Sequence, residues 1–347
     1  MLDQPIQHPS AWSAEQIHND TSWRLALSAT EQAEALHALQ GVLDAGIDLL
    51  DITPENFRLP NLGPRLDAVI DDIEGGRGFA LLCDVPIEGL SPDALEKLFW
   101  GLAAHIGYAE PQDASGKRLH HVQAEFSFKD EASATQHFAT STTRGYQTNI
   151  ELDFHGDGSD ALFFLCHRKG KTGGLSRLAS AITAFNQILS ARPDLALELQ
   201  KPYAFDARGE LGPEHAFQMI PIYSYYRGYL NILYKRGYID LAQHLPGAEQ
   251  MTPAMREAVD LLDRTIRAPG NAYSFMMEPG EILIANNYNI LHSRTVFEDH
   301  DEPARKRHML RIWSTLRRNR RPLPPALQRA REFKASAARR RALGDAT

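Results

Sequence analysis

The feature that most constrains the fold is a series of short apolar runs between residues 146 and 315. They are rich in β-branched and aromatic residues, which is typical of strands, and helical patterns interrupt them only at about 180–200 and after Thr252-Pro253. We therefore predict a mostly β protein with flanking helices, built on a double-sheet barrel of jelly-roll type. The predicted strands are Tyr146–Phe154, Ala161–Cys166, Leu175–Ala179, Ala216–Ile222, Tyr229–Leu233, Tyr273–Glu278, Glu281–Ala285 and Met309–Thr315.

Helix signals and glycine breaks divide the rest of the chain. Ser28 and Glu31 form a capping-box pattern that predicts an amphipathic helix over 28–45. Ser91 followed by Pro92 predicts a second helix start, after the apolar run Phe79–Cys83. We expect an N-terminal helical region at 1–75, a barrel domain at 76–316 with an irregular lid segment at 110–146 and a helical insert at 180–200, and a basic C-terminal extension at 317–347.

The composition is that of an ordinary globular protein, with 43 % hydrophobic and 23 % charged residues in a chain of 347. No stretch approaches the roughly 18 apolar residues of a membrane span, and the polar N-terminus does not resemble a secretory signal. Cys83 and Cys166, the two cysteines, both lie in apolar runs. This favours buried thiols in a reducing compartment and excludes a disulfide framework or a four-cysteine zinc site. We expect a cytoplasmic protein.

The net charge of −7 is unevenly distributed. Residues 317–347 carry ten Arg and Lys against two acids, which leaves 27 bases and 42 acids in the rest of the chain. Such a tail is compatible with a nucleic-acid arm or with a C-terminal helix lying on an acidic body or a neighbouring subunit. We favour the second interpretation, because no other basic patch or recognition helix accompanies the tail. No nucleic-acid or membrane partner is expected, and a homodimer is compatible with the extension.

One segment combines a strand end with two metal-ligand side chains. His155 and Asp157 are two residues apart, flanked by Gly156 and Gly158, and alternate residues of an extended chain point to the same face. An imidazole and a carboxylate can therefore reach one ion together. The spacing alone is weak, because about one His-x-Asp is expected by chance in a chain of this composition. His18-Asn19-Asp20 has the same spacing without any strand context, and we expect no metal there.

A third ligand and an anion-binding arginine follow far along the chain. His292 ends a turn and buried run that begins near Glu278, and two His with one carboxylate leave open positions on iron(II) for a bidentate cosubstrate and O₂. In the last strand, Arg307 and Arg311 share one face. An inward guanidinium needs an anion, and arginine binds carboxylates with two parallel hydrogen bonds.

These residues resemble the taurine dioxygenase and clavaminate synthase-like superfamily of iron(II)/2-oxoglutarate oxygenases. The resemblance covers roughly Gly76 to Trp313 and implies a double-stranded β-helix core. The residues that carry it are His155-x-Asp157, Gly173-Gly174-Leu175-Ser176, His292 and Arg307-x-x-x-Arg311.

The resemblance also implies roles for these residues. His155, Asp157 and His292 would hold iron(II), and Ser176 and Arg307 would bind the distal carboxylate of 2-oxoglutarate. Arg311 would lie near the cosubstrate and the substrate anion. The family more often has Thr where Ser176 stands. Relatives that halogenate have Gly or Ala in place of Asp157, so halogenation is disfavoured.

The expected reaction is hydroxylation of an unactivated C–H bond in a small carboxylated or amino-acid-like metabolite, with 2-oxoglutarate and O₂ consumed and succinate and CO₂ released. Desaturation or cyclisation remains an alternative outcome, and a cupin-type metal enzyme without 2-oxoglutarate remains an alternative class. Arg311 indicates an anionic substrate. Further candidate substrate contacts are Asn149, Glu151 and His121, and His120 and Gln123 could also line the pocket. For each of them, loop packing or strand solvation is at least as good an interpretation.

Overall fold

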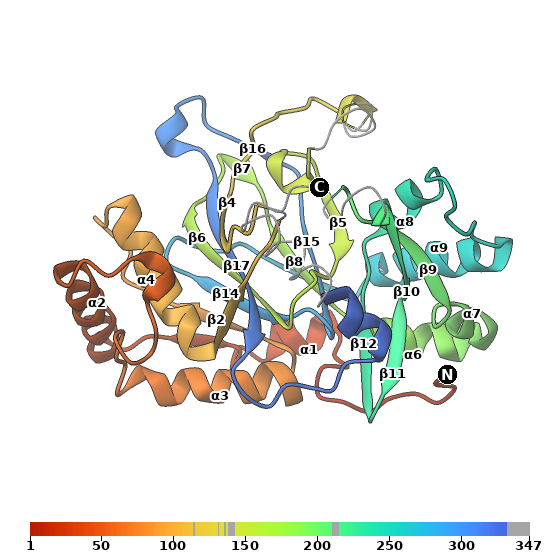
Figure 1. Ribbon diagram of the computed structural model, residues 1–347, viewed down its shortest axis with the longest axis horizontal. Coiled ribbons are helices and arrows are strands. Elements are labelled where there is room, and N and C mark those ends of the chain that lie inside the picture. The colour runs from red at the N-terminus through yellow and green to blue at the C-terminus, as the bar shows by residue number, and fades with distance from the viewer. Residues whose placement is uncertain (114, 131, 135–136, 138–142, 210–214, 332–347) are drawn as a thin grey trace.

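The structure is a computed structural model that describes residues 1–113, 115–130, 132–134, 137, 143–209 and 215–331. Figure 1 shows two sheets in the middle of the molecule, with one group of helices on the left and another group on the right. The left group is formed by α2 (Ala29–Asp44), α3 (Leu62–Gly75) and α4 (Pro92–Ile106). The right group contains α6 (Ala181–Ala191), α7 (Pro193–Glu198), α8 (Arg236–Ala242) and α9 (Pro253–Arg267).

The larger sheet has seven strands in the order β1-β2-β14-β6-β17-β3, with β4 also paired with β17. The β1–β2 pair is parallel and the other pairs are antiparallel. The central strands β2 and β14 are entirely buried, which agrees with their nearly continuous apolar sequences. The strands β6 and β17 are mostly buried, and β17 carries polar side chains among its apolar ones. The strands are β1 (Arg24–Ala26), β2 (Phe79–Cys83), β3 (Gly107–Glu110), β4 (Leu119–Val122), β6 (Ala161–Arg168), β14 (Ile282–Asn286) and β17 (His308–Leu316).

The smaller sheet has four antiparallel strands in the order β13-β8-β15-β5. These strands are β5 (Leu152–His155), β8 (Ser176–Ser180), β13 (Ala272–Phe275) and β15 (Ile290–Arg294). A short antiparallel pair of β7 (Thr172–Gly173) and β16 (Phe297–Glu298) follows one end of this sheet.

The two sheets face one another across a shared core. On β2, Phe79 and Leu81 point inward and belong to one buried cluster with Leu178 of β8. Ala80 and Leu82 point to the opposite face and belong to a cluster with the helices α2, α3 and α4. The strand alternation therefore places helices on one face of the larger sheet and the smaller sheet on the other. This β-rich core with flanking helices agrees with the predicted fold class.

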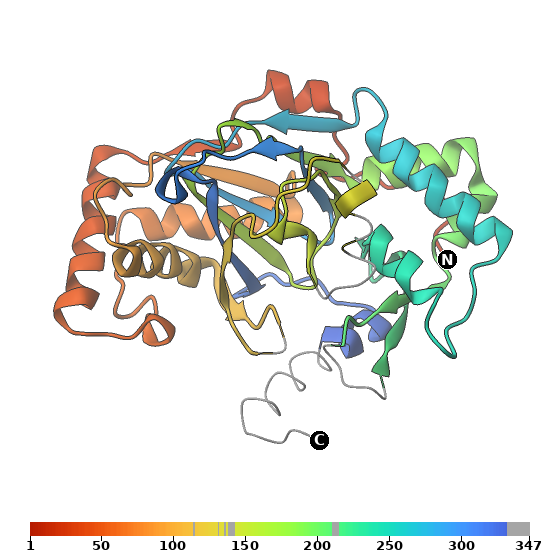
Figure 2. The same cartoon turned by 90° about the horizontal axis from the view of Figure 1, so that it is seen from above.

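A second layer of helices and hairpins packs beside the smaller sheet, as the view from above shows (Figure 2). Ser180 and Thr252 cap α6 and α9 through their side chains, as the sequence predicted for these helix starts. The hairpins are β9 (Pro202–Asp206) with β10 (Phe217–Pro221) and β11 (Tyr223–Tyr226) with β12 (Tyr229–Ile232). The remaining short helices are α1 (Ala14–Asn19), η1 (Leu49–Asp51), η2 (Gly145–Gln147) and η4 (Pro303–Arg305).

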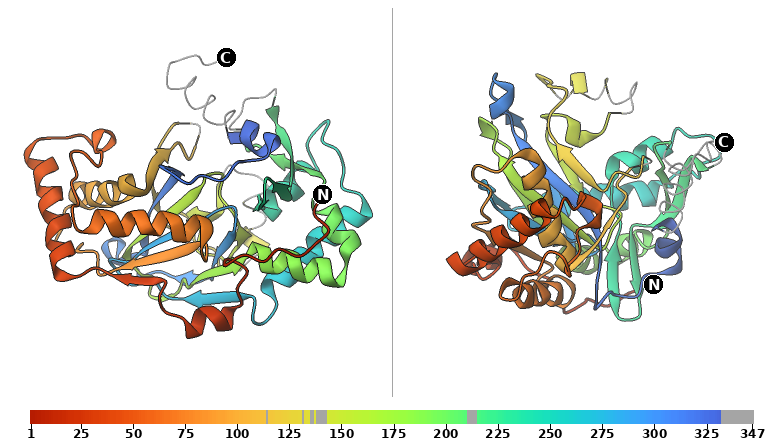
Figure 3. Two further views of the ribbon diagram at one scale, coloured as in Figure 1. Left: turned by 90° about the horizontal axis from the view of Figure 1, so that it is seen from below. Right: turned by 60° about the vertical axis from the view of Figure 1, so that its left-hand side comes forward.

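The N-terminal segment crosses from one side of the molecule to the other (Figure 3). The backbone of Leu2 bonds to Gln200, and that of Ile6 bonds to Asn186 of α6. The region expected to be helical, 1–75, also contributes β1 to the larger sheet. That strand has three residues with little burial contrast, so its sequence carries no period from which it could be predicted. Among the described residues, no helix is long and apolar enough to cross a membrane.

The described part of the C-terminal extension lies on the acidic body of the same chain. Arg318 pairs with Asp71, and Arg331 pairs with Glu110 and Asp160. These contacts agree with the docking interpretation of the basic extension up to residue 331. Residues 332–347, which carry the remaining Arg and Lys residues of the extension, lie outside the described part.

Candidate metal centre

The three predicted metal ligands come together at one end of the space between the sheets. His155 is the last residue of β5, Asp157 lies in the loop that follows, and His292 lies in β15 directly opposite His155 in the strand register. One ligand atom from each side chain lies within 4.8 Å of the other two. Two imidazoles and one carboxylate in this arrangement form the donor set suited to an iron(II) ion with open coordination positions.

The loop between the two sequential ligands is held against the strand connection at 286–290. The Asp157 N–H donates to Oδ1 of Asn287 over 3.1 Å. A Cβ at Gly156 would lie 2.9 Å from the Asn287 carbonyl oxygen, closer than a side chain tolerates. Glycine is therefore required at 156 because the two backbones approach closely there.

Both histidines present a nitrogen suited to a metal. Nδ1 of His155 lies 2.7 Å from the Asp153 carbonyl oxygen, and a proton on Nδ1 that is donated to this oxygen leaves Nε2 as the ligand atom. Both ring nitrogens of His292 are buried and have no hydrogen-bond partner among the described residues. Burial lowers the pKa of both imidazoles, and for His292 the nearby His155 lowers it further. A neutral imidazole with an unused, buried nitrogen fits a metal ligand.

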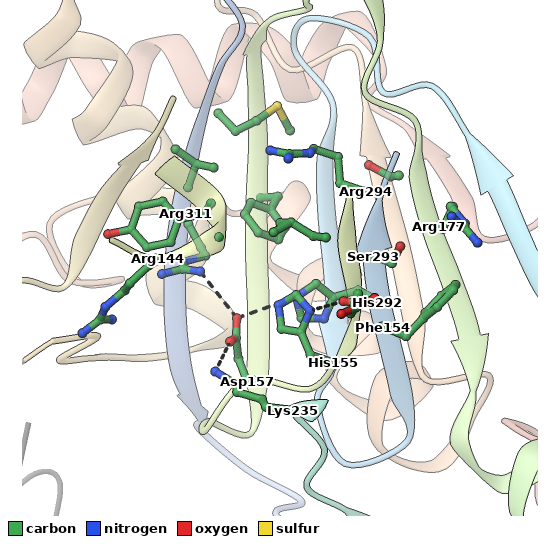
Figure 4. A pocket seen from close by; sticks show the side chains of 18 of the residues that line it. Arg144, Phe154, His155, Asp157, Arg177, Lys235, His292, Ser293, Arg294 and Arg311 are labelled. Atoms are coloured by element: carbon green, nitrogen blue, oxygen red, sulfur yellow. Dashed lines mark hydrogen bonds and ion pairs between the residues drawn. The ribbon is translucent and has the colours of Figure 1, made fainter. Parts of the chain in front are cut away.

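The carboxylate of Asp157 is ionised and held from several sides (Figure 4). Nζ of Lys235 donates to its Oδ1 over 3.0 Å, and Nε1 of Trp313 donates to its Oδ2 over 2.8 Å. The Arg311 guanidinium lies 3.7 Å from Oδ2. Burial alone raises the pKa of Asp157, but the charges of Lys235 and Arg311 outweigh it and hold this pKa well below its usual range.

Lys235 and Trp313 did not emerge from the sequence patterns. Trp313 lies two residues beyond Arg311, so strand alternation would have placed it on the same inward face. Lys235 precedes α8, and its backbone forms an isolated bridge with His155. No spacing or motif marks that lysine in the sequence.

The predicted cosubstrate residues lie at the opposite end of the cavity from Asp157. Ser176 begins β8 directly across from Arg294 of β15, and Arg307 immediately precedes β17. Gly174 has a φ of +76°, and a Cβ there would lie 3.3 Å from Nε of Arg307. The glycine pair before Ser176 thus leaves room for this guanidinium.

Arg311 is fixed between two aromatic rings. Its guanidinium carbon lies 4.9 Å from the ring centre of Tyr146 and 5.0 Å from that of Trp313. Its Nε donates to Oε1 of Gln112 over 2.7 Å. As predicted, Arg311 lies on the inner face of the larger sheet, and it reaches the metal ligands.

The other predicted substrate contacts lie apart from the ligands. Asn149 bonds to the backbone of Phe128, and Glu151 pairs with Arg177 and Arg267. His121 pairs in register with Leu310, whose side chain points toward α4, and its ring lies 3.3 Å from Glu96.

The structure therefore places His121 on the helix-covered face of the larger sheet, away from the cavity. Its neighbour His120 pairs in register with Arg311 and shares the inner face. Asn149 and His121 are not among the residues that line the cavity, and Glu151 lines only the neighbouring cleft.

The ligands line a cavity of about 210 Å³ between the sheets. A larger hollow of about 960 Å³ adjoins it and shares wall residues such as Arg144 and Tyr238. The inner cavity has the dimensions of a small organic molecule rather than of a polymer segment.

Comparisons with known proteins agree with this geometry. The chain belongs to the taurine catabolism dioxygenase TauD, TfdA family, whose model matches residues 45–313. Family membership and the His155, Asp157 and His292 set make it an iron(II)- and 2-oxoglutarate-dependent dioxygenase.

Two curated proteins and several solved structures are similar to the chain. FR-33289 synthase of Streptomyces rubellomurinus is 28 % identical over 94 % of this chain and 95 % of its own length. Taurine hydroxylase-like protein SAT17 of Stachybotrys chartarum is 26 % identical over 87 % of this chain and 77 % of its own length. An asparagine oxygenase structure has a TM-score of 0.65 at 14 % identity, covering 84 % of this chain and 93 % of its own. The non-haem iron oxygenase OrfP has a TM-score of 0.62 at 16 % identity, covering 91 % and 98 %.

Proposed function

We propose that this dioxygenase hydroxylates an unactivated C–H bond of a small anionic metabolite, either carboxylated or amino-acid-like. The observation that carries the proposal is the cationic lining of a small cavity, where Arg311 and Lys235 lie beside the metal ligands. A cavity of about 210 Å³ favours a small molecule, and its buried cations favour an anion.

The metal and the distal carboxylate of the cosubstrate are assigned to separate parts of this cavity. His155, Asp157 and His292 would hold iron(II), while Arg307 and Ser176 would bind the distal carboxylate of 2-oxoglutarate. When bound, the iron and 2-oxoglutarate supply the O₂-activating chemistry, in which the cosubstrate is converted to succinate and CO₂. The chain's own contribution is to orient the reactants and to keep the Asp157 carboxylate ionised and fixed.

Arg311 is the proposed contact for the substrate anion. Its side chain is buried and rigidly stacked, so little conformational entropy is lost when an anion binds to it. Tyr146, which stacks on it, comes from the segment that leads into β5, on the side of the adjoining hollow. We infer that the substrate enters from this hollow, whose wall includes Thr143, Arg144 and Gly145 from the end of the predicted lid segment.

Proteins of the same fold give the proposal further support. One asparagine oxygenase structure contains hydroxyasparagine and succinate with Fe(II), and OrfP structures contain hydroxylated arginine. From the same similarity in fold, we propose that the core is a double-stranded β-helix. It would lie within a domain at 76–316 that carries the helical insert at 180–200.

The test is to incubate the iron-loaded protein with 2-oxoglutarate and a panel of amino acids, other carboxylates, amines and oligomers. Succinate formed above the uncoupled background identifies the substrate, and a product that gains one oxygen atom identifies hydroxylation. We expect turnover with an anionic small molecule, and a raised KM for that substrate in Arg311→Met. Turnover confined to cationic or polymeric compounds would contradict the proposal.

A further inference from the structure

Two buried arginines next to the cavity lack the partners that buried charges normally have. The exposed fraction is 5 % for Arg294 and 7 % for Arg307. Nε and Nη1 of Arg294 and Nη1 of Arg307 are buried without a hydrogen-bond partner among the described residues. Nor does either guanidinium form an ion pair with a carboxylate in the described part of the chain. Buried charges of this kind are costly unless an anion compensates them.

Both guanidiniums contact the same aromatic ring. Both contact the ring of Phe297, at 4.6 Å for Arg294 and 5.2 Å for Arg307. Asp299 accepts a hydrogen bond from the backbone N–H of Arg307, and among the described residues it forms no ion pair with either guanidinium. The pair therefore concentrates positive charge in one place.

The strand register places this pair at a defined distance from the metal ligands. His292 and Arg294 are two residues apart on β15, so both face the cavity, roughly 7 Å apart along the strand. Ser176 of β8 pairs directly with Arg294, and Leu178 pairs with His292. Figure 4 shows the Arg294 side chain projecting from β15 beyond His292. Arg294 thus lies in the same cavity as the metal ligands, a short distance along β15 from His292.

We infer that Arg294 is a second guanidinium for the distal carboxylate of 2-oxoglutarate, which it holds together with Arg307. The inference rests on the proposed function, and it adds a residue that no sequence motif indicated. One carboxylate between two guanidiniums supplies acceptors for the buried donors of both. The two arginines also select 2-oxo acids by chain length. The distance between the two carboxyl ends of the acid must match the fixed distance between the metal ligands and the two arginines.

A purely structural role is the rival interpretation. Nη2 of Arg294 donates to the carbonyl oxygen of Ile150, which anchors the chain ahead of β5. That bond uses one of the guanidinium nitrogens and leaves Nε and Nη1 free for an anion. The two roles differ in one measurable respect. A structural role affects every 2-oxo acid equally, whereas an anion contact affects only those with a distal carboxylate.

The experiment compares 2-oxoglutarate with 2-oxopentanoate, which has the same chain length but no distal carboxylate. Each is titrated anaerobically into the iron(II)-loaded wild type, Arg294→Met and Arg294→Lys, and the visible charge-transfer absorption of the chelate gives Kd. We expect Arg294→Met to weaken 2-oxoglutarate about 10- to 100-fold and to leave 2-oxopentanoate within about two-fold. Arg294→Lys should restore part of the difference, since it keeps the charge without the planar fork.

Arg305→Met is the matched control, because the side chain of Arg305 is 61 % exposed and lies on a nearby loop. It should bind both acids like the wild type. Equal weakening of both acids by Arg294→Met, or no weakening of either, would overturn the inference. If the wild type itself gave no chelate absorption with 2-oxoglutarate, the proposed function would fail instead. Thermal unfolding of each metal-free variant checks folding, and the Lys variant carries the comparison if the Met variant does not fold.

Discussion

Arginine is buried at two places in this molecule, and the two differ in how its charge is satisfied. In the C-terminal segment, Arg321 donates from Nε to Glu74 over 2.6 Å and from Nη1 to Asn289 over 2.7 Å. In the cavity, Arg307 and Arg294 keep buried nitrogens without partners among the described residues. The charge of Arg321 is satisfied within the fold, whereas the unpartnered nitrogens of Arg307 and Arg294 point to a ligand.

The largest effect is expected at the metal ligands. Asp157→Ala removes the ionised ligand and leaves the charges of Lys235 and Arg311 uncompensated, so activity should fall by roughly a thousand-fold or more, the equivalent of about 4 kcal/mol. Iron binding by the purified variant and succinate formation are the measurements. Asp20→Ala is the matched control, because His18-x-Asp20 has the same spacing on the surface. Equal loss in both variants would contradict the assignment.

The comparison of the buried arginines is tested by their effects on stability. Arg321→Met leaves the buried Glu74 carboxylate without its partner and should lower the free energy of unfolding by about 3–5 kcal/mol. Arg307→Met removes an uncompensated charge and should leave the ligand-free protein within about 1 kcal/mol of wild type, or more stable. Denaturant titration measures both. A loss of several kcal/mol in Arg307→Met would show that this arginine has a partner within the protein.

A smaller effect is expected from the residues that hold the ligand carboxylate. Trp313→Phe keeps the ring but removes the N–H that donates to Asp157 Oδ2, so metal affinity should fall about 10- to 100-fold. Competition with a coloured chelator measures this affinity. Trp100→Phe serves as the control, because the N–H of Trp100 bonds to the Ile52 carbonyl far from the cavity. If the metal affinity of Trp313→Phe were unchanged, the hydrogen bond from Trp313 to Asp157 would have no role in metal binding.

The effect that is smallest near neutral pH concerns the opposite face of β17. His308 contacts His121 and His167, and burial, aided by both neighbours, lowers its pKa from 6.5 to about 3. As the pH falls from 6.5 toward 3, the His308 imidazole binds a proton in the unfolded chain but stays neutral in the folded protein. Stability should therefore fall over this window, by at most about 1.4 kcal/mol per pH unit from this group. His308→Gln should have a shallower dependence of unfolding free energy on pH, and an unchanged slope would contradict the shift.

Local alternation indicated His155, Asp157 and Arg311, whereas His292 was assigned only together with the distant Arg307 and the family resemblance. Alternation at the end of β5 and on β17 is sufficient to place His155 beside Asp157 and to turn Arg311 inward. Contacts that depend on strand register were not predictable. His120 and His121 are adjacent on β4 and point to opposite faces of the larger sheet. A prediction that is wrong by one position therefore exchanges the inner face of His120 for the helix-covered face of His121. Lys235 reaches the cavity only because the segment before α8 pairs with β5, and no sequence spacing reports that pairing. Arg294 lies two residues beyond His292, so strand alternation would have placed it on the same face.

The most direct test of the central claim is an anaerobic crystal structure with iron(II) and 2-oxoglutarate bound. We expect one iron ion bonded to His155, Asp157 and His292, with the distal carboxylate of the cosubstrate between Arg307 and Arg294. A metal bound elsewhere, or a cosubstrate whose distal carboxylate points away from both guanidiniums, would contradict it.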